Sequence, residues 1–123
     1  MHYRLKASEV AIIRARILAK QGGLCAICTL PCKKPCLDHD HATGAIRGVA
    51  CSGCNALLGK LENNHKRYGV QNLAAFTNGC AAYLMAHAVN LTGYLHNTFK
   101  TEDEKRIARN TKARTARAAK KEL

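Results

Sequence analysis

Apolar residues recur at helical spacing in two parts of the chain, on either side of a segment that is dense in polar chemistry. Near the N-terminus, Val10, Ile13 and Ile17 repeat every three or four positions, which predicts an amphipathic helix. Ser8 is a residue type that caps helix N-termini, and Gly22 is typical of a helix end. We therefore expect the first helix to lie between these two residues.

The second apolar repeat predicts a helix over residues 72–91. Its members fall on one stripe, which consists of Leu73, Phe76, Cys80, Leu84, His87 and Leu91. The wider segment 71–99 contains no Lys, Arg, Asp or Glu, so this helix has to cover much of its surface against the rest of the chain or a second subunit. Exposed apolar patches usually mark interfaces, and we therefore expect a homodimer.

Between the two helices, residues 24–55 show weak periodicity and two Cys-x-x-Cys pairs. The run between the pairs predicts a short β-hairpin over residues 37–49, with a turn that ends at Gly44. A further helix is expected to open at Asn55, because leucines follow at inward-facing spacing. The segment is therefore predicted to be a hairpin held between two cysteine knuckles.

Charge divides the chain into three zones. Residues 1–70 carry 11 Lys and Arg with 4 acids, 71–99 carry neither, and 100–123 carry 9 and 4. In the last zone, Thr101 and Glu104 match a helix capping box, and basic residues follow. We expect 1–70 to form a core with the N-terminal helix, 71–99 a packing or dimerisation helix, and 100–123 a basic helical arm.

Composition indicates a thin core and a polyanionic partner. Of 58 apolar residues among 123, 20 are alanines, and so small a core is usually stabilised by metal, disulfides or a partner subunit. The net charge of +12 favours binding to a polyanion.

No apolar stretch approaches the roughly 18 residues that span a bilayer, so no membrane partner is expected. The first six residues lack a secretion signal, and we expect a reducing cytoplasm, where cysteines bind metal more often than they pair.

The two cysteine pairs predict one structural zinc site. Each Cys-x-x-Cys turn places two thiolates on one side, and two such turns complete a tetrahedral Cys₄ site that leaves no open position. The predicted ligands are Cys25, Cys28, Cys51 and Cys54. Cys32 and Cys36 have no second pair to complete another site and are expected to stand outside it, although either one is close enough in sequence to replace a member of the first pair.

Two aspartates alternate with two histidines over residues 38–41, a pattern too polar for a core strand. A metal or proton-transfer site would use these groups, whereas a solvated polar loop would carry them incidentally. Along a regular strand Asp38 and Asp40 point one way, and His39 and His41 point the other. A site that uses adjacent residues therefore needs a bent strand end.

Three motifs in order resemble the phage recombination endonuclease VII family, part of the His-Me finger (HNH) nucleases. The resemblance covers residues 24 to about 60 and includes the upstream Cys25-x-x-Cys28. The remaining match is the run Leu37-Asp38-His39-Asp40-His41-x-Thr43-Gly44-x-Ile46-Arg47-Gly48-x-x-Cys51-x-x-Cys54-Asn55-x-x-Leu58-Gly59.

The resemblance implies an α+β, mainly helical fold with a ββα-metal nuclease core and C-terminal helices. Asp38 and Asn55 would hold Mg²⁺ or Mn²⁺ through oxygen atoms, which suit hard cations. His39 matches the general base that takes a proton from the attacking water. His41 would contact phosphate or the ion, and Arg47 would clamp phosphate or stabilise the transition state. Because the base must be unprotonated, acidification should lower the activity.

The resemblance and the charge together predict a metal-dependent DNA endonuclease that cuts branched or distorted DNA during phage replication or recombination, as a Holliday junction resolvase does. Basic zones would contact phosphates without reading sequence. The candidate DNA contacts are Arg14, Arg16, Lys60, Lys105, Arg109 and Lys112. Two alternatives remain open: an HNH-type nicking endonuclease, and a zinc-stabilised nucleic-acid-binding module without catalysis. The last alternative predicts that Asp38 and His39 tolerate alanine whereas Cys25 does not.

Overall fold

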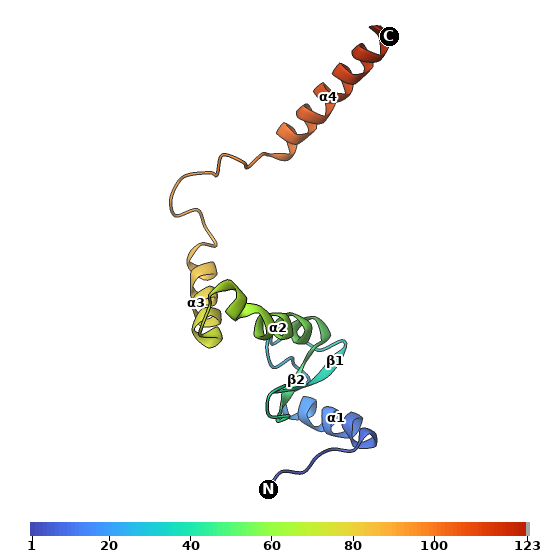
Figure 1. The fold of residues 1–123 in the computed structure, drawn as a ribbon, viewed down its shortest axis with the longest axis vertical. Coiled ribbons are helices and arrows are strands. Elements are labelled where there is room, and N and C mark those ends of the chain that lie inside the picture. The colour runs from blue at the N-terminus through green and yellow to red at the C-terminus, as the bar shows by residue number, and fades with distance from the viewer. Residues whose placement is uncertain (123) are drawn as a thin grey trace. The chain divides into compact units, whose positions relative to one another are not determined.

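A computed structural model describes residues 1–122 and confirms a mixed α+β, mainly helical fold with one two-stranded sheet (Figure 1). The elements, in chain order, are a 3₁₀ turn η1 (Ala7–Glu9), helix α1 (Val10–Lys20), strands β1 (Pro35–His39) and β2 (Ile46–Cys51), helix α2 (Ser52–Asn64), a 3₁₀ turn η2 (His65–Tyr68), and helices α3 (Leu73–Ala86) and α4 (Glu102–Glu122). No helix within residues 1–122 is long and apolar enough to cross a membrane.

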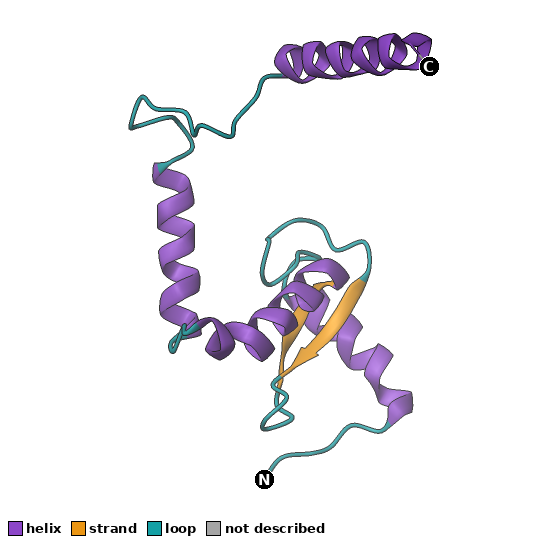
Figure 2. Cartoon of the chain, turned by 45° about the horizontal axis from the view of Figure 1, so that its top comes forward, coloured by secondary structure: helices purple, strands orange, loops and turns teal. Residues whose placement is uncertain are grey.

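The chain divides into two compact units, Met1–Cys80 and Ala81–Leu123. In the first unit, α1 and α2 both pack against the two strands, and the hairpin lies between them (Figure 2). This arrangement positions the start of α2 directly beside the end of β2, because the helix begins at the residue that follows the strand. The second unit contains the end of α3, the connecting segment and α4.

The first helix forms where the apolar repeat predicts it, but its N-terminus differs. Ser8 lies inside η1 and does not cap the helix, so that prediction is wrong. Instead the Glu9 carboxylate accepts hydrogen bonds from the Lys6 backbone N–H at 3.0 Å and from the Tyr3 hydroxyl at 2.9 Å. The predicted stop is confirmed, since α1 ends at Lys20 and Gly22 takes a positive φ of 68°.

The two strands pair in antiparallel register with one irregularity. Asp38 lies opposite Gly48 and His39 lies opposite Ile46, so Arg47 is the extra residue of a β-bulge. A bulge bends its strand and redirects the side chain of the extra residue. The bulge therefore lies in β2, opposite the end of β1, and Arg47 stands at it.

The buried core is small and lies where the first cysteine turn meets β2. Cys25, Val49 and Ala50 are the core residues of the described chain, at 2%, 0% and 1% exposure. The Gln21 amide joins the two parts: its nitrogen donates to the carbonyls of Leu24 and Val49 at 2.8 and 2.9 Å, and its oxygen accepts from the Val49 N–H at 2.9 Å. A Cβ at Gly48 would approach this amide oxygen to 3.2 Å, which explains the glycine.

Two element boundaries differ from the sequence prediction. Helix α2 begins at Ser52, three residues before Asn55, because Cys51 is both the end of β2 and the helix N-cap. Helix α3 ends at Ala86 and does not reach residue 91. Beyond its end, the Asn90 carboxamide accepts the Gly93 N–H at 2.8 Å, and Gly93 has a φ of 78°. This turn chemistry replaces the last helical turn of the predicted stripe.

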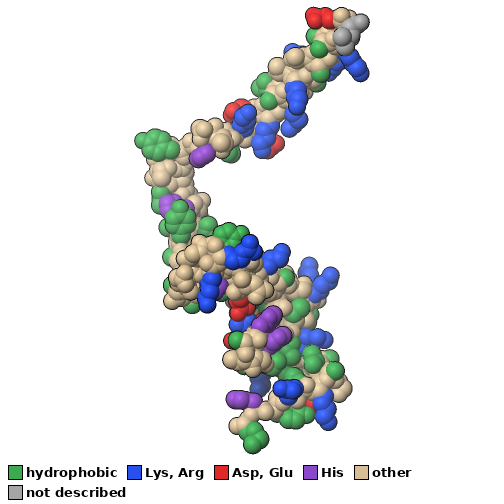
Figure 3. Space-filling model, viewed as in Figure 1, with side chains coloured by type: hydrophobic (Ala, Val, Ile, Leu, Met, Phe, Trp, Pro, Cys, Tyr) green, Lys and Arg blue, Asp and Glu red, His purple; other side chains and the backbone are tan. Residues whose placement is uncertain are grey.

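The capping box of the C-terminal helix is confirmed. The Thr101 hydroxyl oxygen accepts the Glu104 N–H at 3.1 Å, and the Glu104 carboxylate accepts the Thr101 backbone N–H at 3.5 Å. Lys and Arg side chains are distributed along α4 (Figure 3), and every described residue of this helix is exposed. The three-zone division remains a prediction.

Candidate metal centre and nuclease site

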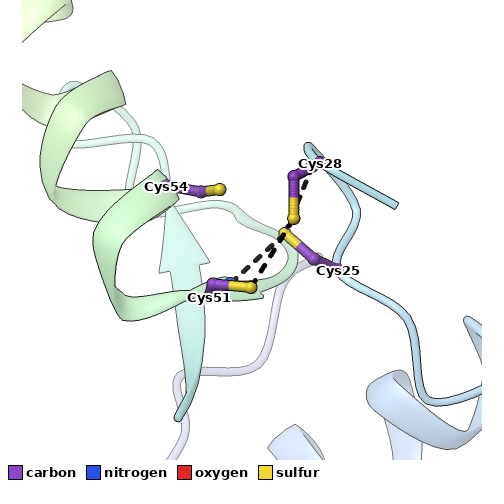
Figure 4. Close-up of side chains that lie close together, drawn as sticks. All are labelled: Cys25, Cys28, Cys51 and Cys54. Carbon is purple, nitrogen blue, oxygen red and sulfur yellow. Dashed lines mark hydrogen bonds between the residues drawn. The ribbon is translucent and has the colours of Figure 1, made fainter. Parts of the chain in front are cut away.

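Four cysteine side chains converge from three places in the chain (Figure 4). Cys25 and Cys28 lie in the turn after α1, Cys51 ends β2, and Cys54 lies in the first turn of α2. Their four sulfur atoms all lie within 4.8 Å of one another. The geometry could therefore hold one metal ion, with the four ligands that the sequence predicts.

One sulfur–sulfur distance in the cluster and the chemistry of its donor set fit zinc. A tetrahedron with Zn–S bonds of about 2.3 Å has sulfur–sulfur edges of about 3.8 Å. The Cys28 and Cys51 sulfurs are 3.7 Å apart, close to that edge. Four thiolates form a soft donor set that selects zinc over Mg²⁺ or Ca²⁺ and leaves no position for water.

The Cys25 sulfur accepts three backbone hydrogen bonds. Burial raises the pKa of the Cys25 thiol, but backbone N–H groups of Cys28, Cys51 and Ile27 donate to the sulfur and together lower its pKa to about 6. The donor–sulfur distances are 3.4, 3.3 and 3.4 Å. A thiolate therefore forms at this position near neutral pH, which is the form that binds metal.

Cys32 and Cys36 differ in their distance from the cluster. The Cys32 sulfur lies 3.6 Å from that of Cys51, and this hydrogen bond, followed by burial, raises the pKa of the Cys51 thiol. The nearest polar contact of the Cys36 sulfur is the Lys34 carbonyl at 3.9 Å. The group whose sulfurs all lie within 4.8 Å of one another includes neither cysteine, so Cys32 is a neighbour of one member of the group and Cys36 lies apart.

Arg47 joins the hairpin to α2 through two carboxylates. Its Nε and Nη2 donate to Asp38 at 2.7 and 3.1 Å, and its Nη1 and Nη2 donate to Glu62 at 2.9 and 3.1 Å. Hydrogen bonds to Glu62 first, and to Asp38 next, raise the pKa of Arg47 far above its usual value. The Asp38 side chain is 13% exposed, whereas the other two are about one-third exposed at 35% and 34%. Glu62 was not among the residues that the sequence predicted.

His39 and His41 lie on one face of the hairpin end. Their rings stack, with centroids 4.7 Å apart and planes inclined by 20°. The alternation expected of a strand holds here, because Asp38 pairs with Arg47 while the two histidines pair with each other. Both histidines are accessible at least in part, so a substrate and solvent can reach them.

Asp40 shapes the turn that follows β1. Its carboxylate accepts the backbone N–H groups of Ala42 at 2.8 Å and Thr43 at 3.2 Å, and these bonds hold the pKa of Asp40 below its usual value. Gly44 completes the turn with a φ of 77°. A shallow hollow of about 200 Å³ opens between this turn and α2. It is lined by Asp40, His41, Ala42, Gly59, Glu62 and Asn63.

Comparison with known proteins identifies the family. A family model described as recombination endonuclease VII matches residues 2–84, which is more than half of the chain. The chain belongs to this family. The matched region contains the cysteine cluster, the hairpin and α2.

Two curated phage proteins share a shorter segment with this recombination endonuclease VII family member. The Gene 59 protein of Mycobacterium phage D29 is 44% identical over 41 residues, and that of Mycobacterium phage L5 is 47% identical over 38 residues. The alignments cover 31% and 28% of this chain. They cover 25% and 23% of the relatives, so the chain spans about a quarter of their length.

The remaining predicted site residues lie on three helices. Asn55 is half-buried in the first turn of α2, which packs against β1 and β2, and Lys60 is exposed farther along the same helix. Arg14 is half-buried and Arg16 exposed on α1. The other predicted DNA contacts are the exposed α4 residues Lys105, Arg109 and Lys112. The roles assigned to all these residues remain predictions.

Proposed function

We propose that this chain is a metal-dependent DNA endonuclease that hydrolyses phosphodiester bonds in branched or distorted DNA during phage replication or recombination. The observation that carries the proposal is the family match over a region in which Asp38 and His39 lie on a bulged hairpin packed against the helix that carries Asn55. The Holliday junction resolvase activity is the specific form that we propose.

Zinc would bind the four clustered cysteines and contribute folding energy. The site has four protein ligands and no place for a water molecule, so chemistry has to occur elsewhere. The ion would join the turn after α1 to the β2–α2 junction, which are the two parts that the small core connects. Its role would be to hold the turn after α1 against the β2–α2 junction.

A second, hydrolytic Mg²⁺ or Mn²⁺ would be held by oxygen atoms of Asp38 and Asn55. The Asp38 carboxylate fits this task because each of its oxygens accepts one hydrogen bond from Arg47 and keeps a further lone pair. When bound, such an ion supplies charge stabilisation at the scissile phosphate and the leaving oxygen. His39 would take the proton of the attacking water, and its ring is accessible to that water.

His41 and Arg47 would act around this centre. The His41 ring stacks on His39 and thereby restricts its orientation, and its accessible edge can contact a phosphate. Arg47 uses four N–H groups on Asp38 and Glu62, which leaves one N–H for a phosphate oxygen. We therefore place Arg47 beside the scissile group as a positioning and charge-stabilising residue.

The basic residues and the apolar helix supply the proposed partner surfaces. Lys and Arg side chains on α1, α2 and α4 would neutralise DNA phosphates without reading the bases. On α3, Phe76, Tyr83 and Leu84 are 43%, 66% and 67% exposed, which supports a homodimer with two active sites. The proposed place of action is the cytoplasm of a bacterial host.

The experiment is incubation of supercoiled plasmid, linear duplex and a four-way junction with Mg²⁺ or Mn²⁺, followed by electrophoresis. Asp38→Ala and His39→Ala serve as variants, and Glu9→Gln serves as a control outside the site. We expect the wild type and E9Q to cleave the junction preferentially, and both site variants to be inactive. Nicking of plasmid without junction preference would support the nicking endonuclease, and DNA binding without any cleavage would support the non-catalytic module.

A further inference from the structure

Glu62 lies outside the motif that carries the family resemblance, yet it makes the second half of the Arg47 ion-pair cluster. It stands about two helical turns after Asn55, and seven residues return a helix to nearly the same face. The face of α2 that presents the candidate metal ligand therefore also presents Glu62. On that face Glu62 meets a guanidinium that the β-bulge has redirected.

The geometry fixes how Arg47 approaches Asp38. The planar guanidinium has two edges suited to carboxylates, and each edge here is filled by one carboxylate through two hydrogen bonds. Nη2 takes part in both pairs, so its two hydrogens point to different carboxylates. Rotation of Arg47 away from either partner would break bonds to both.

The cluster also balances charge. Two carboxylates and one guanidinium give a net charge of −1, so the positive charge of Arg47 is shared between Asp38 and Glu62. Without Glu62, the whole positive charge of Arg47 would face Asp38, and a cation would meet a carboxylate whose charge is already neutralised. The Asp38 side chain is only 13% exposed, so solvent would screen the attraction between Arg47 and Asp38 only in part.

We propose that Glu62 is a positioning residue that holds Arg47 and thereby keeps Asp38 a strong ligand for a divalent cation. The inference rests on the proposed function, because it presupposes a hydrolytic metal at Asp38. Glu62 acts through Arg47 and not as a ligand or as a distant charge. Removal of its charge should therefore weaken divalent-metal binding only while Arg47 is present.

The test is a double-mutant cycle read out by Mn²⁺ binding to the zinc-loaded full chain, measured by electron paramagnetic resonance. The variants are Glu62→Gln, Arg47→Met and the double variant. The control is Glu102→Gln, which removes the same charge from an exposed α4 ion pair with Lys105. Zinc content and thermal melting check that each variant is folded.

We expect E62Q to weaken Mn²⁺ affinity by about fivefold in the wild-type background and by less than about twofold in the R47M background, as coupled neighbours do. E102Q should leave the affinity unchanged. Unchanged affinity in E62Q would overturn the inference, and so would an equal loss in both backgrounds, which would show that Glu62 acts by direct ligation or by charge alone. If the wild type bound no Mn²⁺, the metal site of the proposed function would fail together with this inference.

Discussion

Replacement of Cys25 by serine should unfold the first unit. In zinc-finger peptides, structural zinc contributes about 10–16 kcal/mol of apparent binding free energy at neutral pH. The free energy of unfolding of a whole domain is about 5–15 kcal/mol, which is of the same size as the zinc contribution. Loss of most of that contribution should therefore unfold the first unit. The apolar core cannot compensate, because Val49 is the one large aliphatic side chain among the three core residues, and its burial is worth about 1.5–3 kcal/mol.

Cys25 is the informative position because its sulfur accepts three backbone N–H groups as well as lying in the cluster. The substitution therefore removes a proposed zinc ligand and weakens the hydrogen bonds that shape both cysteine turns. Cys36→Ser is the matched control, since the Cys36 sulfur lies apart from the cluster. Elemental analysis gives the zinc content, and amide dispersion in a ¹H–¹⁵N NMR spectrum reports the fold.

The wild type and C36S are expected to hold one zinc per chain and to give dispersed spectra. C25S is expected to lose most of its zinc and the dispersion of residues around Val49. A folded C25S chain with one bound zinc would refute the reasoning, and so would a zinc-free wild type that is fully folded.

Three further predictions follow from the same structure. Gln21→Ala should destabilise the first unit by about 1–3 kcal/mol in chemical denaturation, because it leaves the buried Val49 N–H without its acceptor, and an unchanged midpoint would contradict this. Because hydrogen bonds lower the pKa of Asp40 in the folded chain, the ionised carboxylate stabilises the turn above its ordinary pKa of 3.8, and this contribution is lost as the pH falls through the folded pKa. Asp40→Ala should therefore lower the melting temperature more at pH 7 than in acid, and an equal loss at both would contradict this. Deletion of residues 100–123 should weaken DNA binding and flatten the dependence of log K on log salt by about 0.9 for each duplex phosphate that the arm neutralises, whereas an unchanged slope would show that α4 is only a solvated helix.

The cysteine spacing and the apolar repeats were sufficient to predict most of the fold. Metal-ligand spacing is a local property of the sequence, and the four predicted cysteines are those whose sulfurs meet. Helix ends were less predictable because they depend on side-chain hydrogen bonds that the capping preferences of single residues do not predict. Ser8 is displaced from the cap position by a Glu9 carboxylate that binds Lys6, and the Asn90 turn follows the early end of α3.

The candidate site was predictable where it follows the family motif and obscure where it depends on tertiary structure. Asp38 and Arg47 were predicted from the hairpin motif, but their ion pair depends on a bulge that periodicity does not reveal. Glu62 was missed because nothing in its local sequence marks it. Its two-turn spacing from Asn55 on the predicted helix is the signal that could have found it. Gln21 was missed for the same reason, since its partner Val49 is 28 residues away.

The measurement that tests the central claim most directly is the single-turnover rate of four-way junction cleavage by His39→Ala, at enzyme concentrations that saturate binding. A general base contributes to the chemical step and not to ground-state binding. We therefore predict that H39A binds the junction and zinc as the wild type does, while its cleavage rate falls by at least about a hundredfold. Cleavage by H39A at the wild-type rate, with binding intact, would contradict the assignment of this hairpin as the catalytic centre.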